Sequence, residues 1–271
     1  MGINQVIRGD DHLSNTPKQM VVYEALGFPL PKFNHVPMIH NAAGKKLSKR
    51  DGATDVMAYK EMGYTPAALL NFLVRLGWSH GDQEIFSMDE MIHLFNPVDI
   101  NKSASIYNTD KLDWLNAHYI KNSSNDELAQ LLTEYGLVLT SHDKREILLD
   151  TLKERAKTLK ELASLVNEVL STPHEYDAKS VKKAFKDGAI EILNNFGKKI
   201  DACEELHLPV DYHAVMEGLA TEMEIGFGKI GQPLRVALLG KLSGPGLDEV
   251  MAIIGKEETM LRIANAITAN L

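Results

Sequence analysis

The chain has 271 residues, of which 44% are hydrophobic and 24% are charged, and its formal net charge is −8. This length and composition are typical of a folded protein with one large or two ordinary domains, and they exclude an intrinsically disordered chain. A single cysteine excludes an internal disulfide framework and a cysteine-based zinc cluster. Because no signal peptide and no apolar run of the about 20 residues needed to span a bilayer are found, we expect a cytoplasmic protein without a membrane partner.

The charge is distributed unevenly along the chain. Residues 1–50 carry a net charge of +4, residues 51–140 of −8, residues 141–200 of +2 and residues 201–271 of −6. Since the Debye length is about 8 Å at physiological salt, a positive segment can bind a polyanion although the chain as a whole is acidic. The net charge therefore does not exclude a nucleic-acid partner.

The first fifty residues are predicted to form a strand, a helix, a second strand and a loop. The β-prone run NQVIR ends at a Gly-Asp-Asp turn, and TPKQMVVYEALG follows it. There Thr16 is the expected N-cap, Pro17 the first helical residue and Gly27 the end of the helix. Residues 33–41, FNHVPMIHN, are expected to form one strand. This order is typical of a βαβ unit, but the segment is too short for a whole parallel-sheet domain.

The remainder of the chain has helical periodicity. N-caps are expected at Thr65, Ser87 and Asn125, and Glu90 completes a capping box with Ser87. Apolar residues keep nearly helical spacing over residues 143–170. Further helices are expected over residues 178–196, 211–224, 233–242, 247–254 and 257–269. The predicted fold class is mainly α, with a small α/β segment at the N-terminal end.

The loop GKKLSKRDG, residues 44–52, is the first candidate for chemistry. It places Lys46, Ser48, Lys49 and Arg50 between glycines after a predicted strand. A run of basic residues is usually a solvated turn. Mobile ammonium groups between glycines also suit the stabilisation of triphosphate charge in a transition state. The order of residues is not that of a P-loop.

Several stretches resemble a known family. KLSKR, residues 46–50, resembles the KMSKS signature of class I aminoacyl-tRNA synthetases. VIRGDDHLSNTPKQ and HVPMIHNAAGKKLSKRDGA resemble bacterial glutamyl-tRNA synthetase, as do ALLNFLVRLGWSHGDQEIFS, NKSASIYNTDKLDWLN, ERAKTLKEL and GKIGQPLRVALLG. These stretches follow the family's order over essentially the whole chain. The family's His-Ile-Gly-His type signature does not occur in the sequence, so the chain resembles the C-terminal part of the enzyme.

The resemblance implies three regions. Residues 1–53 would be the last part of a Rossmann-like catalytic domain with its KMSKS-type loop, and residues 54–118 a helical stem-contact region. Residues 119–271 would be a helical anticodon-binding domain, with a sub-boundary near 172–178. Glutaminyl-tRNA synthetase, the nearest related enzyme, has an anticodon domain built of β-barrels, which the helical pattern disfavours.

The resemblance also implies the activity of a glutamate–tRNA ligase. The full-length enzyme would activate glutamate with ATP and Mg²⁺ and transfer it to tRNA-Glu, and the family suggests a monomer. Because half of the ATP site would be missing, we expect this chain alone to be catalytically inactive. The alternative is a non-catalytic tRNA- or RNA-binding protein derived from a synthetase.

Roles in the basic loop follow from the same resemblance. Lys49 would contact ATP and stabilise the transition state in which the glutamate carboxylate attacks the α-phosphate. Lys46, Ser48 and Arg50 would help to shape and close the loop.

The Gly-Asp-Asp segment supplies the remaining candidates at the catalytic end. By resemblance, Arg8 would hold the amino-acid substrate, and a guanidinium suits bidentate recognition of a carboxylate. Asp11 and His12 would line the active site, although such a turn can also serve only to cap the following chain. His12, His35 and His40 show no zinc-site pattern, so we expect no zinc.

The anticodon-binding residues are expected near the C-terminus. By resemblance, Arg235, Pro245 and Leu247 would lie at the first anticodon base, and Arg155 would read the third. An arginine can bind the edge of an unstacked base or stack on its face. For Arg155, an ion pair on a solvated helix is the alternative.

Overall fold

The structure is a computed structural model that describes residues 2–47, 55–140, 142–186 and 188–269. The chain forms two compact units, Met1–Asn122 and Ser123–Leu271. Most described residues are helical and the strands are few and short, which confirms the expected fold class.

The elements of the first unit are, in chain order, β1 (Gln5–Gly9), η1 (Asp10–Asn15), α1 (Thr16–Ala25), β2 (Lys32–Val36), β3 (Ile39–His40), α2 (Val56–Met62), α3 (Pro66–Gly77), α4 (Met88–Leu94), η3 (Pro97–Asp99), β4 (Ser105–Ile106) and α5 (Thr109–Asn122).

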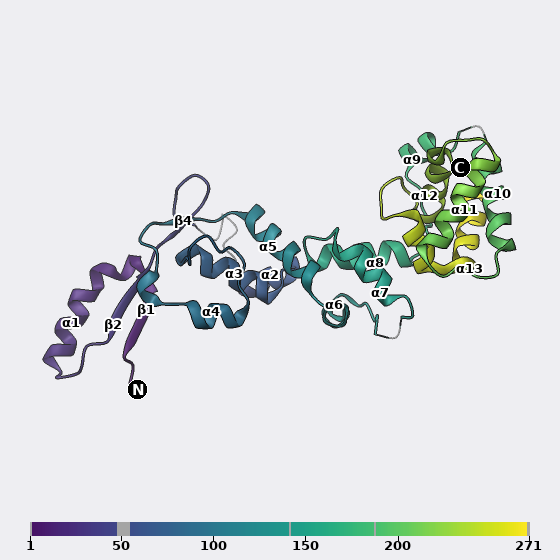
Figure 1. The fold of residues 1–271 in the computed structure, drawn as a ribbon. Helices are drawn as coiled ribbons and strands as arrows, with labels where there is room; N and C mark the ends of the chain where they lie inside the picture. Colours follow the sequence, from purple (N-terminus) through teal and green to yellow (C-terminus); the bar gives the residue numbers. More distant parts are fainter. Residues whose placement is uncertain (1, 48–54, 141, 187, 270–271) are drawn as a thin grey trace. The chain divides into compact units, whose positions relative to one another are not determined.

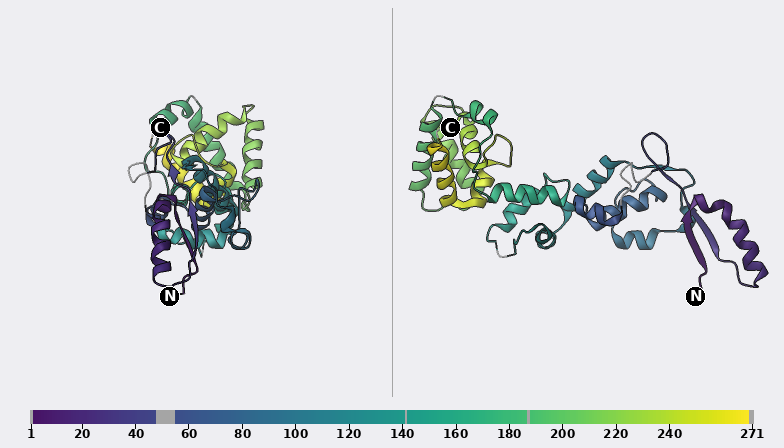
Figure 2. Two further views of the ribbon diagram at one scale, coloured as in Figure 1. Left: turned by 90° about the vertical axis from the view of Figure 1, so that its left-hand side faces the viewer. Right: turned by 180° about the vertical axis from the view of Figure 1, so that it is seen from behind.

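The predicted βαβ unit is present. Strands β1 and β2 pair in parallel, with Arg8 opposite His35, and α1 connects them and lies alongside the pair (Figures 1 and 2). The prediction of a single strand over residues 33–41 was wrong, because Pro37 has no N–H to donate and divides it into β2 and β3. Strand β3 pairs instead with β4.

The N-cap predicted at Thr16 was also wrong. The 3-10 helix η1 leads directly into α1, so Thr16 has helical backbone angles and its side chain does not cap the helix. Its hydroxyl accepts a hydrogen bond from Arg8 instead. The caps predicted at Thr65 and Ser87 are confirmed, the latter as a full capping box with Glu90.

The core of the first unit lies between its helices and not at the βαβ segment. Side chains of α2, α3 and α5 form one buried cluster that includes Tyr59, Phe72 and Leu112, and Trp78 and Phe86 belong to a second. Thus the helices that follow the basic loop contain the buried core of this unit.

The elements of the second unit are, in chain order, α6 (Asn125–Leu132), η4 (Thr133–Tyr135), α7 (Arg145–Lys153), α8 (Leu159–Leu170), α9 (Ala178–Ala184), α10 (Ala189–Ala202), α11 (Pro209–Glu222), α12 (Phe227–Leu239) and α13 (Leu247–Thr268).

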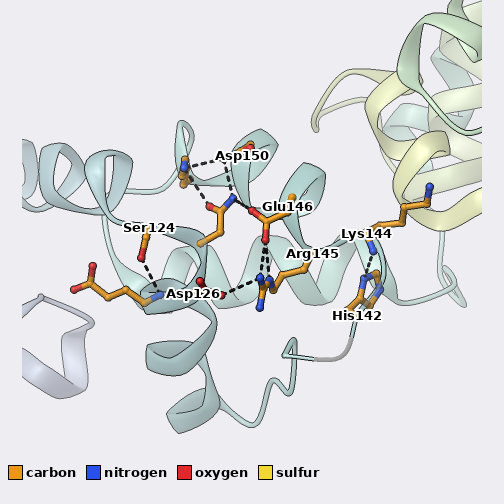
Figure 3. Close-up of polar contacts among 10 residues, drawn as sticks. Ser124, Asp126, His142, Lys144, Arg145, Glu146 and Asp150 are labelled. Carbon is orange, nitrogen blue, oxygen red and sulfur yellow. Dashed lines mark hydrogen bonds and ion pairs between the residues drawn. The ribbon is translucent and has the colours of Figure 1, made fainter.

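A polar network joins α6 to α7 (Figure 3). Ser124, not Asn125 as predicted, is the N-cap of α6. The Asn125 amide instead donates to Glu146 and Asp150 at 2.6 and 3.0 Å, because the cap lies one residue earlier and leaves this side chain facing α7. Arg145 pairs with both Asp126 and Glu146. Arg145 on α7 and the Asn125 amide on α6 thus each bind a carboxylate of the other helix, so the network links α6 to α7.

Residues 143–170 form two helices instead of one continuous helical pattern. Helix α7 ends at Lys153, and α8 begins after Thr158, whose hydroxyl accepts from the Glu161 amide at 3.1 Å. The backbone amide of Lys157 donates to the Glu161 carboxylate at 2.8 Å. This capping arrangement starts a new helix, while the apolar spacing persists because α7 and α8 pack against each other.

Three more predicted helices differ in extent. Residues 178–196 are divided between α9 and α10, because Gly188 has φ +88°. Helix α11 covers Pro209–Glu222 and not residues 211–224. Helix α12 begins at Phe227, so Pro233, predicted as its start, lies inside it and removes one backbone hydrogen bond. The two helices predicted over 247–254 and 257–269 are confirmed as the halves of α13, which has non-helical backbone angles at Gly255.

Helices α10 to α13 pack together around one part of the core of the second unit (Figures 1 and 2). Most of its fully buried large side chains are aliphatic or aromatic, such as Leu193, Phe196 and Tyr212. Arg262 is the exception, with 0% exposure. It donates to Glu258 at 2.7 Å and to the Leu238 carbonyl at 2.8 Å, which links α13 to the end of α12.

Candidate functional site

Arg8 is fixed in place by the pairing of β1 with β2. Its guanidinium donates to the Thr16 hydroxyl at 2.7 Å and to His35 Nε2 at 3.4 Å, and it lies 5.2 Å from the centre of the Phe33 ring. Thr16 and His35 are themselves 3.1 Å apart. The side chain is therefore oriented before any ligand binds. The sequence did not indicate Thr16 or Phe33 as partners of Arg8: Thr16 was predicted only as an N-cap, and His35 was considered only as a zinc ligand.

Asp11 and Lys46 lie close together although 35 positions separate them in the sequence. Lys46 Nζ is 3.6 Å from Asp11 Oδ2. A turn whose backbone amides at Ala43 and Lys45 donate to the Asn41 side chain brings Lys46 back beside His40. The start of the basic loop thus meets the segment that follows β1. Both side chains are exposed, so the ion pair itself contributes little stability.

The other candidates at this end are placed as follows. His12 is exposed and lies 3.4 Å from Asn15. Ser48, Lys49 and Arg50 lie outside the described residues. Among the residues that are described, no cluster of His, Cys, Asp or Glu has the geometry of a metal site. Likewise, no helix in the described ranges is long and apolar enough to cross a membrane.

Arg155 and Arg235 converge on one turn in the second unit. Arg155, just after α7, donates to the Gly244 carbonyl at 3.4 Å, and Arg235, on α12, donates to the neighbouring Pro245 carbonyl. Burial and the charge of Arg155 lower the pKa of Arg235, and Asp248 opposes this shift. Two guanidiniums are thus held near each other, where an electron-rich partner would reduce their repulsion.

The turn between α12 and α13 requires glycine at residue 244. Gly244 has φ +148°, and a Cβ atom there would lie 2.5 Å from Leu239 Cδ1. The neighbouring residue Pro245 is buried, and its carbonyl oxygen accepts the hydrogen bond from Arg235. Leu247 is also buried and forms one wall of a cavity of about 310 Å³ that Arg235 and Phe227 line as well. Arg155 and Arg235 therefore contact the turn that contains Pro245, and Leu247 lines the adjoining cavity.

Contacts from α8 and α9 hold this turn. Lys241 pairs with Glu168 at 2.8 Å, and the amide of Leu242 donates to the Ser180 hydroxyl at 3.2 Å. The amide of Asp177 donates to the Gly240 carbonyl at 2.8 Å. No sequence pattern indicated these partners, because each contact joins segments more than sixty residues apart.

Two known families match parts of this chain. The family described as "Anticodon binding domain" matches residues 99–267, and the family described as "tRNA synthetases class I (E and Q), catalytic domain" matches residues 1–114. Both arginines and the turn that they contact lie within the first match. Arg8, Asp11 and Lys46 lie within the second.

Similar curated proteins are glutamate–tRNA ligases. Glutamate–tRNA ligase 1 of Sulfurimonas denitrificans is 73% identical over 98% of this chain, and glutamate–tRNA ligase 2 of a Nitratiruptor species is 66% identical over 98%. The crystal structure of a glutamate tRNA ligase from Elizabethkingia meningosepticum, in complex with its amino acid, superposes with a TM-score of 0.86 at 32% identity. This superposition covers 98% of this chain and 57% of that one. The chain spans 58% of the length of the two curated relatives, and it belongs to the glutamyl-tRNA synthetase family of class I synthetases.

Proposed function

We propose that this chain carries the tRNA-binding part and the KMSKS-type loop of a cytoplasmic, monomeric glutamate–tRNA ligase. The complete enzyme would use MgATP to activate glutamate, forming glutamyl adenylate and pyrophosphate. It would then transfer the glutamyl group to the terminal adenosine of tRNA-Glu.

The convergence of Arg155 and Arg235 on the turn at Gly244–Pro245 is the observation that carries this proposal. Each guanidinium has five N–H donors, and only one of them donates to the turn in the hydrogen bonds given above. Further donors can therefore bind a ligand. Such donors suit the edge of a splayed base, and the cavity beside Leu247 offers an apolar wall for its face. In this proposal Arg235, Pro245 and Leu247 bind the first anticodon base, and Arg155 binds the third.

At the catalytic end, the proposal assigns glutamate to Arg8 and the triphosphate to Lys49. The fixed guanidinium of Arg8 suits a carboxylate substrate, because little side-chain freedom is lost on binding. Asp11 and His12 line the same site. Lys46 lies beside Asp11, and in this proposal Lys46, Ser48 and Arg50 help to shape and close the loop.

The same proposal expects no catalysis by the chain alone. The ATP site would need the His-Ile-Gly-His type signature as well as the KMSKS-type loop, and the sequence contains only the loop, so the reacting groups could not be positioned together. The βαβ segment also leaves Val21, Val22 and Leu26 exposed by 64%, 55% and 63%. Formation of glutamyl adenylate should be measured with MgATP, glutamate and tRNA-Glu, on protein free of host enzyme. Adenylate formed by the purified chain would overturn the expectation.

Binding of tRNA tests the function itself. The chain should be titrated with tRNA-Glu and with the same tRNA carrying a substituted anticodon, at one fixed salt concentration. Weaker binding to the substituted tRNA would support recognition of the anticodon. The difference in affinity between the two tRNAs should then be smaller for the variants Arg155→Gln and Arg235→Gln. Equal binding to both tRNAs would contradict the anticodon-binding roles proposed for these residues. It would favour a protein that binds RNA without reading the anticodon.

A further inference from the structure

A groove runs between α9 and the N-terminal half of α12. Two cavities, each of about 310 Å³, lie along these helices. One reaches Arg235 and Leu247 at the candidate base site, and the other extends to Lys186. Three residues line both cavities: Lys183, Gly228 and Gln232. The cavities therefore adjoin, and together they form what we call the α9–α12 groove.

The α9–α12 groove is lined by cations. Lys183, Lys186, Lys229 and Arg235 all belong to its walls, and among its described lining residues there is no carboxylate. Residues 123–271 as a whole contain seventeen basic and twenty-four acidic side chains, a net charge of −7. The described lining of the groove is therefore positive in a unit whose net charge is negative, and it favours an anionic ligand.

The three lysines of the groove also differ from other lysines of the unit. Lys153, Lys199 and Lys241 each pair with a carboxylate at 2.5–2.8 Å. Within the described ranges, no carboxylate lies within 4 Å of the groove lysines. Their ammonium groups are thus not neutralised by these parts of the protein, and a ligand phosphate would not have to displace an internal partner.

Small and aromatic residues complete the groove. Gly228 and Gly231 are three positions apart on α12, and no atom lies within 4 Å of where a Cβ of Gly228 would be. A sugar–phosphate chain can therefore approach the helix backbone closely. At the end near Arg235, the Phe227 ring is 40% exposed and lies 5.3 Å from the ring of His213. An exposed ring beside a cationic groove is the usual arrangement for binding single-stranded nucleic acid.

We infer that the α9–α12 groove binds the sugar–phosphate backbone of single-stranded RNA next to the base held at Arg235. The inference rests on the proposed function, and it extends the contact from the base to the loop nucleotides beside it. Lys183, Lys186 and Lys229 neutralise phosphates, Gly228 and Gly231 allow close approach, and Phe227 stacks on a base.

The proposed RNA groove is tested by measuring the affinity of the chain for a stem-loop RNA that carries the anticodon loop of tRNA-Glu, at several salt concentrations. The triple variant Lys183→Gln, Lys186→Gln, Lys229→Gln should bind on the order of 10- to 100-fold more weakly at low salt. Its slope of log K against log salt should fall by about 2, as expected for three lost phosphate contacts on a single strand. The matched control Lys160→Gln, Lys182→Gln, Lys198→Gln removes the same charge from exposed lysines outside the groove and should leave the slope unchanged. Equal effects of the two triple variants would overturn the inference.

A second variant tests the groove without changing charge. Gly228→Gln introduces a side chain that the folded protein can accommodate, and glutamine is a better helix former than glycine. The variant should keep or raise Tm while its affinity for the stem-loop falls at least several-fold. Unchanged affinity would contradict a close approach of the RNA at this position.

Two further comparisons separate this inference from the function on which it rests. If the unaltered chain binds stem-loops with native and substituted anticodons equally, the proposed function fails. If it discriminates between them but the groove triple variant keeps its affinity and slope, only the groove inference fails. An RNA duplex of the same length that competes as well as the stem-loop would also contradict a single-strand groove.

Discussion

The βαβ segment and the helical second unit bury their apolar residues to very different degrees. In the second unit, leucines of α6, α7 and α8 such as Leu128, Leu148 and Leu162 have no exposed surface. In the βαβ segment, Val21, Val22 and Leu26 of α1 and its C-cap are more than half exposed. The helical unit therefore has a core of its own. The βαβ segment has the right local structure but leaves its apolar side chains uncovered, which is typical of a surface that another part of a protein covers.

The largest expected effect is at Arg262, the buried cation of the second unit. Arg262→Ala removes both hydrogen bonds to Glu258 and the Leu238 carbonyl and leaves the carboxylate without its charged partner. We expect a loss of about 3–5 kcal/mol in the free energy of unfolding. Arg145→Ala, which breaks ion pairs with exposed carboxylates, is the control and should cost less than about 1 kcal/mol. Denaturant unfolding followed by circular dichroism measures both, and a similar cost for the two would mean that Arg262 does not stabilise this core.

Truncation of one apolar side chain in each region tests the comparison directly. Leu148→Ala should lower the free energy of unfolding by about 2–5 kcal/mol, because it opens a cavity in a dry core. Val21→Ala should change it by less than about 0.5 kcal/mol, since the side chain is already in solvent.

The two tryptophans provide a readout for this test. Trp78 and Trp114 both belong to the first unit, so tryptophan fluorescence follows that unit, while circular dichroism follows all the helices. Leu148→Ala should shift the dichroism transition and leave the fluorescence transition in place. A large loss of stability in Val21→Ala would mean that α1 is packed after all.

A hydrophobic dye should detect the uncovered βαβ surface. The native chain is expected to raise the fluorescence of ANS, and the double variant Val21→Lys, Val22→Lys should reduce this signal by about half or more. Val210→Lys, at an exposed valine of α11, serves as the control and should have a much smaller effect. If the double variant binds the dye as well as the unaltered chain, the apolar surface lies elsewhere.

The smallest effect is the pH dependence of the α6–α7 network (Figure 3). Hydrogen bonds from Lys153 and Asn125 lower the pKa of Asp150, and those from Asn125 and Arg145 lower the pKa of Glu146. Because the folded pKa values lie below the unfolded ones of about 4, the stabilisation is present above pH 4 and is lost as the pH falls further. Tm should therefore drop on acidification, and Asn125→Ala should make the drop shallower. An unchanged acid profile in this variant would exclude the network as its source.

The sequence by itself predicted the fold class, the βαβ order, most helices and the family, because these depend on local periodicity, caps and motifs. The caps at Thr65 and Ser87 are local events, and they were confirmed. The same local reasoning was wrong at Thr16 and Asn125, because each side chain found a partner from another element. Local reasoning also predicted one continuous helical pattern where α7 and α8 are separate helices. The apolar spacing continues across the break between them because the two helices pack against each other.

Only the tertiary structure decided which functional candidates meet. It brings Arg155 to Gly244 across 89 positions, pairs Lys46 with Asp11, and fixes Arg8 against His35 on the neighbouring strand. It also brings Lys183, Lys186 and Lys229 to one groove. Such contacts depend on how the helices and strands pack in space, and the spacing of residues within one helix or strand contains no information about that packing.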